Sequence, residues 1–469
     1  MNRTTTEQHA DAANPQEAGN PAFVYLATAV ATVGGFLFGF DTAIIAGAIG
    51  FIMEYFEKIK HITLTPLQEG FAVSSVLIGC MIGASVAGFV SDRFGRKKVL
   101  FAAAIIFVFT AVLAAIPQTL TQFAIARLLM GIAVGIESVL SPLYIAEIAP
   151  ANIRGRLVTL NHVALTIGML SAYVIAIILE PLGAASNWRW MFASGAIPAG
   201  IFLIALAWIP ESPRWLIERG LNDKAMSVLT KVGGSNRARV EMERIKSSIA
   251  EESGSISQLF APGLRLALVV GVVLAILQQI TGINVILYYA PEVFKNAGLA
   301  TNQALWSSVL VGVVNLIANI VAVMIIDKVG RKPLLIFGTL SMGVFLGLTG
   351  LSFIPSLHIS SVWTVIFILG YVTSFMVGLG PGFWTVVSEI FPTRVRGRAM
   401  GIATFFIWSS CFVVAQTFPS LLKLLGGPHT FWLYGLMCIL TIVFTWIFVP
   451  ETKGKTLEEI EKHWLARKY

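Results

Sequence analysis

An aspartate lies in this sequence where water should not reach it. Asp41 follows GGFLFGF and precedes TAIIAG, inside a long apolar block. An ionised carboxylate at the centre of a membrane costs on the order of 3 kcal/mol even on insertion scales. Asp41 must therefore be protonated or paired. Arg127, in another apolar block, is the obvious cation, because arginine stays charged and can donate two parallel hydrogen bonds to a carboxylate.

A pair of this kind has two interpretations. If a conformational change withdraws Arg127, the proton affinity of Asp41 changes, and proton movement can be coupled to that change. The alternative is a static ion pair that locks two helices together. Glu137 follows Arg127 on the same apolar block, about 15 Å further along a helix, so we do not expect it to replace Asp41. It is either a second titrating group or a buried carboxyl that is protonated or paired locally.

A second block is rich in amide and hydroxyl groups, which hydrocarbon penalises unless they line a polar cavity; it carries Gln278, Gln279, Asn284 and Tyr288. Amides both donate and accept hydrogen bonds, as sugar hydroxyls do. These positions spread too widely to share one face of a straight helix, so we expect a local break at Gly282, which is tolerated where the backbone lines a cavity. The alternative is that the amides only bond neighbouring helices.

The elements that position these groups are membrane spans. Of the 469 residues, 56% are hydrophobic and 12% are charged, against roughly 25% charged in soluble domains. Apolar blocks such as 71–90 and 99–116 approach the roughly 20 residues that cross a bilayer as helix. We expect an all-α membrane protein of twelve transmembrane helices, centred near residues 36, 80, 107, 135, 168, 199, 282, 315, 344, 375, 410 and 439. No signal peptide is evident at the start.

The basic residues indicate the orientation, because cytoplasmic loops carry an excess of Lys and Arg. With both termini in the cytoplasm, the 33 Lys and Arg residues all fall on that side except Lys58, Lys60, Arg127, Arg189, Lys295 and Lys423. The expected organisation is a polar tail (1–21), a six-helix bundle (22–209), cytoplasmic linker helices (210–266), a second six-helix bundle (267–449) and a cytoplasmic tail (450–469). Cys80, Cys411 and Cys438 lie inside predicted spans and are expected to be packing residues.

The two halves of the chain repeat each other. DRFGRKKVL at 92–100 returns as DKVGRKPLL at 327–335, and Pro-Glu-Ser at 210–212 returns as Pro-Glu-Thr at 450–452. Between them, Glu147 with Arg-Gly-Arg at 154–156 returns as Glu389 with the same triplet at 396–398. Three motifs in the same order and at similar spacing indicate a duplicated six-span unit, which is typical of carriers that alternate access around a central site.

These motifs, together with PESPRWL at 210–216, QQITGINVILYY at 278–289, GPGFWTVVSEIFP at 380–392 and PETKGKTLEEIE at 450–461, identify the chain as a member of the sugar porter family of the major facilitator superfamily. It most resembles the bacterial proton-coupled xylose, galactose and glucose porters. The resemblance implies the major facilitator fold of two six-helix pseudo-repeats. It also implies transport of a monosaccharide (hexose or pentose) with a proton by alternating access. Alternatives are a passive sugar facilitator and a non-transporting sugar sensor.

The resemblance also assigns residues. In the family, proton symporters carry Asp and Arg at the positions of Asp41 and Arg127, whereas facilitators tend to lack the Asp. Where the family usually has a sugar-binding Gln on the fifth span this chain has His162, and Ile407 stands where many porters place an amide, so the sugar is left open. The predicted substrate-binding residues are Phe38, His162, Gln278, Gln279, Asn284, Tyr288, Asn315, Gly380, Trp384 and Trp408.

Charged residues repeat beside the predicted helix ends in both halves. Surface charges of this kind would each contribute little to stability. Their repetition instead indicates a cytoplasmic gating network that holds the outward-facing state and breaks on inward opening. The residues are Asp92, Arg96, Glu147 and Arg154 in the first half and Asp327, Arg331, Glu389 and Arg396 in the second.

No motif for an enzyme is evident, because the sequence has no phosphate-binding Gly-rich loop, no metal-ligand cluster and no nucleophile with a base at recognisable spacing. We therefore expect no catalytic residue, no metal and no cofactor, with a proton as the coupling ion. The expected partners are the monosaccharide, the proton and membrane lipid, without nucleic acid. We expect a monomer in the inner membrane.

Overall fold

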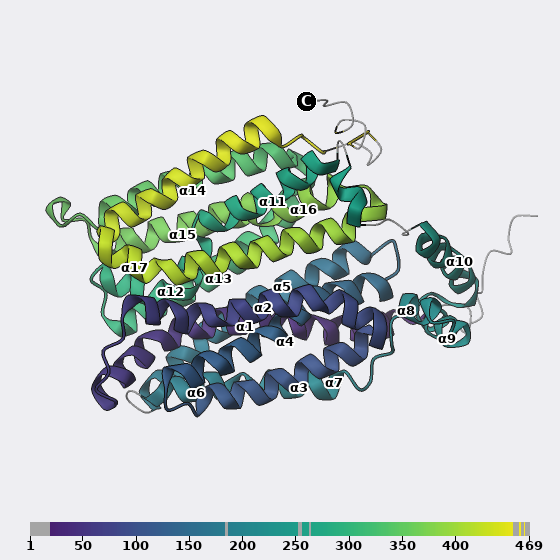
Figure 1. The fold of residues 1–469 in the computed structure, drawn as a ribbon, viewed down its shortest axis with the longest axis horizontal. Helices are drawn as coiled ribbons and strands as arrows, with labels where there is room; N and C mark the ends of the chain where they lie inside the picture. Colours follow the sequence, from purple (N-terminus) through teal and green to yellow (C-terminus); the bar gives the residue numbers. More distant parts are fainter. Residues whose placement is uncertain are drawn as a thin grey trace, which may run out of the picture.

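The chain folds as a bundle of long helices (Figure 1). The computed structural model describes residues 19–182, 186–251, 256–261, 264–453, 459–460 and 464, and all regular structure in these ranges is helical. Helix starts follow the local sequence: Asn20 caps the first helix ahead of Pro21, and Thr65 forms a capping box with Gln68 ahead of the second.

The first half contains seven α-helices that make six passes. Asp41 lies on α1, which packs mainly against α5 and α4, and the sixth pass is divided between two shorter helices. The bounds are α1 Pro21–Glu54, α2 Pro66–Phe94, α3 Arg96–Ala115, α4 Leu120–Ile148, α5 Arg154–Leu179, α6 Asn187–Ser194 and α7 Ala196–Ala205. A π-helical turn, Tyr55–Ile59, extends α1, and a 3-10 turn, Glu180–Leu182, extends α5.

Three short helices link the halves: α8 (Pro213–Glu218), α9 (Asn222–Gly233) and α10 (Ser235–Glu251). A 3-10 turn at Ile256–Phe260 follows them. Their apolar faces form a small core of their own, which includes Leu216, Leu229 and Met242. The linker helices lie at one end of the bundle in Figure 1; we call this the linker end and the other the opposite end.

The second half repeats the plan, with two of its passes broken near their middle. Its helices are α11 Leu264–Ile280, α12 Ile283–Asn296, α13 Thr301–Val329, α14 Arg331–Ser352, α15 Ser361–Val377, α16 Leu379–Glu389 and α17 Thr393–Phe448, with a 3-10 turn at Pro355–Leu357. The break between α11 and α12 lies at Gly282, whose φ of 94° is left-handed, so the expected break in this span is confirmed.

Eleven helices or helix pairs in the described ranges are long and apolar enough to cross a membrane. The last of them, α17, contains two legs that meet at Gly426, whose φ of 74° and ψ of 169° are not helical. Counting these legs separately gives the twelve expected passes. The chain is therefore a multi-pass membrane protein.

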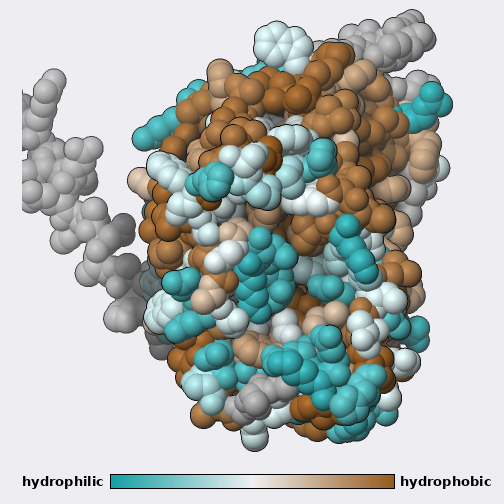
Figure 2. Space-filling view, turned by 90° about the vertical axis from the view of Figure 1, so that its left-hand side faces the viewer, coloured by the Kyte–Doolittle hydropathy of each residue, from teal (hydrophilic) through white to brown (hydrophobic). Residues whose placement is uncertain are grey.

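The halves meet along three helix pairs: α1 with α12, α2 with α17 and α5 with α13. Close contacts gather towards the opposite end. Gln416 of α17 accepts a hydrogen bond from Ser74 of α2 at 2.7 Å and donates to the carbonyl of Leu67 at 2.8 Å. Tyr173 of α5 donates to the carbonyl of Leu287 at 2.9 Å. Figure 2 looks onto this end, where hydrophilic side chains gather between hydrophobic flanks.

Candidate functional site

The pairing expected from the sequence is present. Asp41 on α1 and Arg127 on α4 are both buried, and Nη1 of the arginine donates to the aspartate carboxylate. Arg127 also lies 5.3 Å from the centre of the Phe192 ring, a favourable cation–π geometry. Its Nε and Nη2 atoms find no hydrogen-bond partner among the described residues. The charge of Arg127 therefore neutralises one carboxylate, and two of its donor nitrogens have no hydrogen-bond partner among the described residues.

The amide residues form a chain across the break at Gly282. Asn284 of α12 donates to Gln279 of α11, and Gln279 donates to Gln278 at 3.3 Å. Gln278 in turn donates at 3.4 Å to the backbone carbonyls of Leu379 and Gly380 at the start of α16. The break lets residues that would point in different directions on a straight helix face one another. Gly380 thus joins the predicted group through its carbonyl oxygen.

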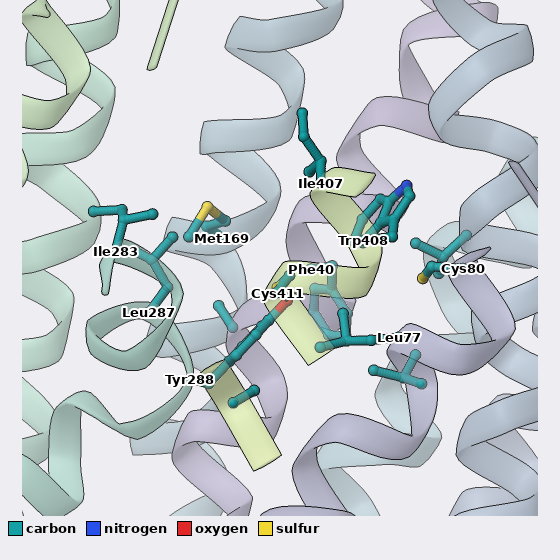
Figure 3. Packing of buried hydrophobic residues seen from close by; sticks show 14 of the residues in the cluster. Phe40, Leu77, Cys80, Met169, Ile283, Leu287, Tyr288, Ile407, Trp408 and Cys411 are labelled. Carbon is teal, nitrogen blue, oxygen red and sulfur yellow. Dashed lines mark hydrogen bonds between the residues drawn. The ribbon is translucent and has the colours of Figure 1, made fainter. Parts of the chain in front are cut away.

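Aromatic and sulfur groups contact this chain; Figure 3 shows Tyr288, Trp408 and Cys411 among the buried residues of this region. The rings of Phe38 on α1 and Trp408 on α17 lie 5.4 Å apart, so the contact joins the two halves. One turn after Trp408, the sulfur of Cys411 accepts a hydrogen bond from Asn284 at 3.1 Å and lies 3.8 Å from the hydroxyl of Tyr288. These residues bring α1, α12 and α17 together around the amide chain.

Two further predicted residues lie on neighbouring helices. Asn315 of α13 donates weakly to the sulfur of Met169 on α5, at 3.7 Å, and its amide oxygen is buried with no partner among the described residues. Trp384 of α16 is half-buried and packs edge-on against Phe383, with ring centres 5.1 Å apart. The unsatisfied amide oxygen of Asn315 is available to a ligand hydroxyl.

His162 on α5 faces the interior of the protein. Its side chain is exposed, yet it is densely surrounded by other parts of the chain. The apolar residues of α5 that face outward, Leu160, Ile167 and Val174, recur every seven residues and lie on the opposite side of the helix. His162 shares its side with the buried Met169. Its exposure is therefore to a space inside the bundle.

At the linker end, the charged motif of the first half forms a compact cluster. Arg96 donates to both oxygens of Glu147, at 3.0 and 3.1 Å, and lies 3.1 Å from Asp92. Arg154 donates to Glu241 of α10 at 3.2 Å. These contacts join α3 to α4 and α5 to the linker, within the first half.

The second half repeats this cluster. Arg331 donates to Glu389 at 3.0 Å, and Arg396 donates to the carbonyl of Phe391, five residues back, as Arg154 does to that of Ala149. The side chain of Asp327 lies outside the described residues. The gating role of the eight residues stays a prediction.

The structure explains why Pro-Glu-Ser and Pro-Glu-Thr repeat. α3 and α14 each begin after a glycine with left-handed φ, 101° at Gly95 and 105° at Gly330, so no side chain at either cap position satisfies the first amides. Glu211 instead accepts from the amide of Lys97 at 3.0 Å, and Glu451 accepts from the two amides that open α14, at 3.2 and 3.1 Å. Each carboxylate caps a helix from a distant segment.

Hydrogen bonding also sets the charge state of the second of these caps. Burial would raise the pKa of Glu451, but bonds from the backbone amides of Lys453, Arg331 and Lys332 outweigh it and hold the pKa below its ordinary value. The carboxylate of Glu451 is therefore ionised near neutral pH, and it caps the start of α14 in this charged form.

Several residues that contact the site or join the two halves are missing from the sequence prediction. Cys411 is buried and free, as are Cys80 and Cys438, but it also bonds the amide chain. Gln416 and Ser74 hold the halves together. A polar side chain in an apolar span is a signal that would have found Gln416, whereas cysteine gives no such signal.

Comparison with known proteins decides the family. The family model described as "Sugar (and other) transporter" matches residues 27–464. The chain belongs to this transporter family. It is 42% identical over 449 residues to the arabinose-proton symporter of Bacillus subtilis (strain 168), covering 94% of this chain and 95% of that protein. It is 40% identical over 478 residues to the D-xylose-proton symporter of Escherichia coli (strain K12), covering 95% and 96%.

Solved structures confirm the expected fold. The inward-open conformation of the xylose transporter XylE from E. coli superposes with a TM-score of 0.84 at 38% identity, over 94% of this chain and 100% of that one. The proton:xylose symporter XylE bound to 6-bromo-6-deoxy-D-glucose gives a TM-score of 0.80 at 40% identity, over 95% and 100%. The chain therefore has the major facilitator fold.

Proposed function

We propose that this chain carries a monosaccharide into the cell together with a proton, by alternating access between its two halves. The observation that carries the proposal is the buried pair of Asp41 and Arg127 in the same bundle as an amide-lined interior. A sugar site alone needs no buried charge, whereas symport needs a group whose proton affinity depends on conformation.

The substrate class follows from the amide chain and from the relatives. Gln278, Gln279 and Asn284 offer donors and acceptors that match vicinal hydroxyls, and the rings of Phe38 and Trp408 offer an apolar surface for the C–H faces of a sugar. The similar proteins named above carry arabinose and D-xylose with protons. A pentose is the substrate we infer for this chain.

We assign the linker end to the cytoplasm of a bacterial inner membrane, with both termini on that side, because its loops hold most of the Lys and Arg. The hydrogen bonds of Gln416 then close the outer end. In this proposed orientation the structure is a state closed to the outside.

Uptake into proteoliposomes tests the proposal. The full-length protein is reconstituted, and entry of radiolabelled arabinose, D-xylose, D-glucose, D-galactose and inositol is measured with and without an imposed pH gradient. We expect a pentose to accumulate above the external concentration only when the outside is more acidic. Uptake that stops at equal concentrations and ignores the gradient would support a facilitator instead, which is the second candidate function.

A further inference from the structure

Two buried tyrosines contact the break between α11 and α12. Tyr371 of α15 is fully buried, and its hydroxyl donates a hydrogen bond to the backbone carbonyl of Thr281 at 3.0 Å. Tyr434, on the second leg of α17, places its ring against Gly282: a Cβ atom built on this glycine would lie 2.9, 3.0 and 3.2 Å from three atoms of the ring. Each of the two residues between α11 and α12 is thus contacted by a tyrosine from another helix.

The bond from Tyr371 satisfies a carbonyl that the break leaves free. In an unbroken helix the carbonyl of Thr281 would accept a hydrogen bond from the amide of Val285, but that amide bonds the carbonyl of Gly282 at 3.1 Å instead. Thr281 is fully buried, and a buried carbonyl at the end of a helix needs a partner from outside that helix. Tyr371 supplies this partner.

The ring of Tyr434 contacts the break by shape and not by hydrogen bonding. Its hydroxyl is buried and has no hydrogen-bond partner among the described residues. Gly282 has a left-handed φ of 94°, which glycine adopts without strain, and its lack of a side chain lets the ring approach the backbone. A ring packed this closely limits the angles that α11 and α12 can take relative to each other.

The break in turn sets the geometry of the amide chain. Gln278 and Gln279 precede it, Asn284 follows it, and the bond from Asn284 to Gln279 spans it. The amides bond atoms of α16 and of the first leg of α17, whereas the tyrosines come from α15 and from the second leg of α17. A change of angle at the break would therefore move Asn284 relative to the two glutamines.

We propose that Tyr371 and Tyr434 are positioning residues for the sugar site. They fix the bend at Gly282 and so hold Asn284 against the two glutamines that precede the break, and neither tyrosine has to touch the sugar. Because they act differently, the two hydroxyls differ in importance: that of Tyr371 is required for the geometry, and that of Tyr434 is not.

This inference rests on the proposed function, and the test separates the two. Wild type, Tyr371→Phe, Tyr434→Phe and Tyr434→Leu are compared as full-length proteins. Titration with the sugars of the uptake panel gives the dissociation constant, exchange in proteoliposomes at equal pH gives the maximal rate, and thermal unfolding in detergent gives the stability. Tyr144→Phe is the matched control, because Tyr144 is a buried tyrosine of the first half that donates to the carbonyl of Pro210 at 2.8 Å.

We expect Tyr371→Phe and Tyr434→Leu to raise the sugar dissociation constant at least fivefold, while the maximal rate of exchange stays within twofold of wild type. Tyr434→Phe should bind sugar as wild type does, because the hydroxyl that it lacks makes no hydrogen bond among the described residues. Tyr144→Phe should also keep the wild-type affinity, although it should unfold at a lower temperature because it loses the same kind of bond as Tyr371→Phe.

Wild-type affinity in a folded Tyr371→Phe or Tyr434→Leu protein would overturn the inference. It would also be overturned if Tyr434→Phe or Tyr144→Phe lost as much affinity as Tyr371→Phe, since the loss would then not depend on the contacts at the break. If wild type binds none of the sugars, the proposed function has failed, and the inference fails with it.

Discussion

The hydrogen bonds of Gln278 leave its amide poorly satisfied. Its donor contacts to the carbonyls of Leu379 and Gly380 measure 3.4 Å, longer than the 2.7–3.2 Å that protein N–H···O bonds usually show. A side chain held in place by weak bonds can exchange them for better ones to a ligand without a large loss. We therefore expect the hydrogen bonds of Gln278 to improve more than those of the other amides in the chain when sugar binds.

Replacing Gln278 by Ala should weaken sugar binding by about 1 to 3 kcal/mol, because a sugar hydroxyl loses its partner. Titration of the purified protein with D-xylose or arabinose measures the effect. Asn296→Ala is the control, because Asn296 is an exposed amide at the end of the same broken pass. Wild-type affinity in a folded Gln278→Ala protein would remove this residue from the site.

For single residues, the sequence predicted a partner where an unpaired buried charge would be too costly. A charge inside an apolar block needs a counter-charge, and that requirement alone selected Arg127 for Asp41. The sequence could not predict the hydrogen-bond partners of Cys411, because a buried cysteine can equally serve only as a small packing residue. Nor could it predict that the buried Glu137 has no hydrogen-bond partner in the part of the chain that the structure describes, since this depends on which helix covers it.

Among the elements, the broken passes matter most for the site. The predicted span centred near residue 282 has its break at Gly282 itself, and the amides on either side converge for that reason. The sequence indicated this break because a straight helix would scatter the polar residues. The capping of α3 and α14 by distant glutamates was not predictable, although the repeated Pro-Glu pairs showed that both halves share a feature there.

Glu211→Gln or Glu451→Gln should lower the free energy of unfolding by about 1 kcal/mol each, because a neutral amide caps helix amides less well than a carboxylate. Thermal unfolding in detergent measures this, with Glu218→Gln, a partly exposed residue of α8, as control. Loss of sugar transport without any loss of stability would contradict a capping role.

The cap at Glu451 should also respond to acid. Its pKa is lowered in the folded protein, so its contribution to stability is complete above the ordinary carboxyl pKa and is lost as the pH falls through the lowered value. The difference in stability between wild type and Glu451→Gln should therefore be constant near neutral pH and shrink in acid. A difference that grows on acidification would show that another group is responsible.

For the whole molecule, the conformation depends on contacts between halves that are far apart in sequence. Ser74 and Gln416 are separated by most of the chain, and no local pattern in the sequence pairs them. The duplication predicted two halves and a central site, but which end is closed follows only from these contacts. Closure at the opposite end is therefore a finding of the structure alone.

Gln416→Leu removes both of the glutamine's hydrogen bonds to α2, so it should shift the equilibrium towards opening of the opposite end by the energy of those bonds. A cysteine in place of Ser74, which is buried and bonds Gln416, should react with a membrane-impermeant maleimide several-fold faster in this background. Gln122→Leu, at an exposed amide of the same end, should leave the rate unchanged. Equal rates in both backgrounds would mean that Gln416 does not hold this end closed.

The central claim is that sugar and proton move together because Asp41 exchanges a proton when Arg127 is withdrawn. The most direct measurement is the lumenal pH of proteoliposomes during sugar entry, for wild type and for Asp41→Asn, which keeps the size of the side chain but carries no proton. The account predicts that sugar entry acidifies the lumen with wild type, whereas Asp41→Asn binds and exchanges sugar without acidification. Acidification by Asp41→Asn at the wild-type rate would contradict the claim.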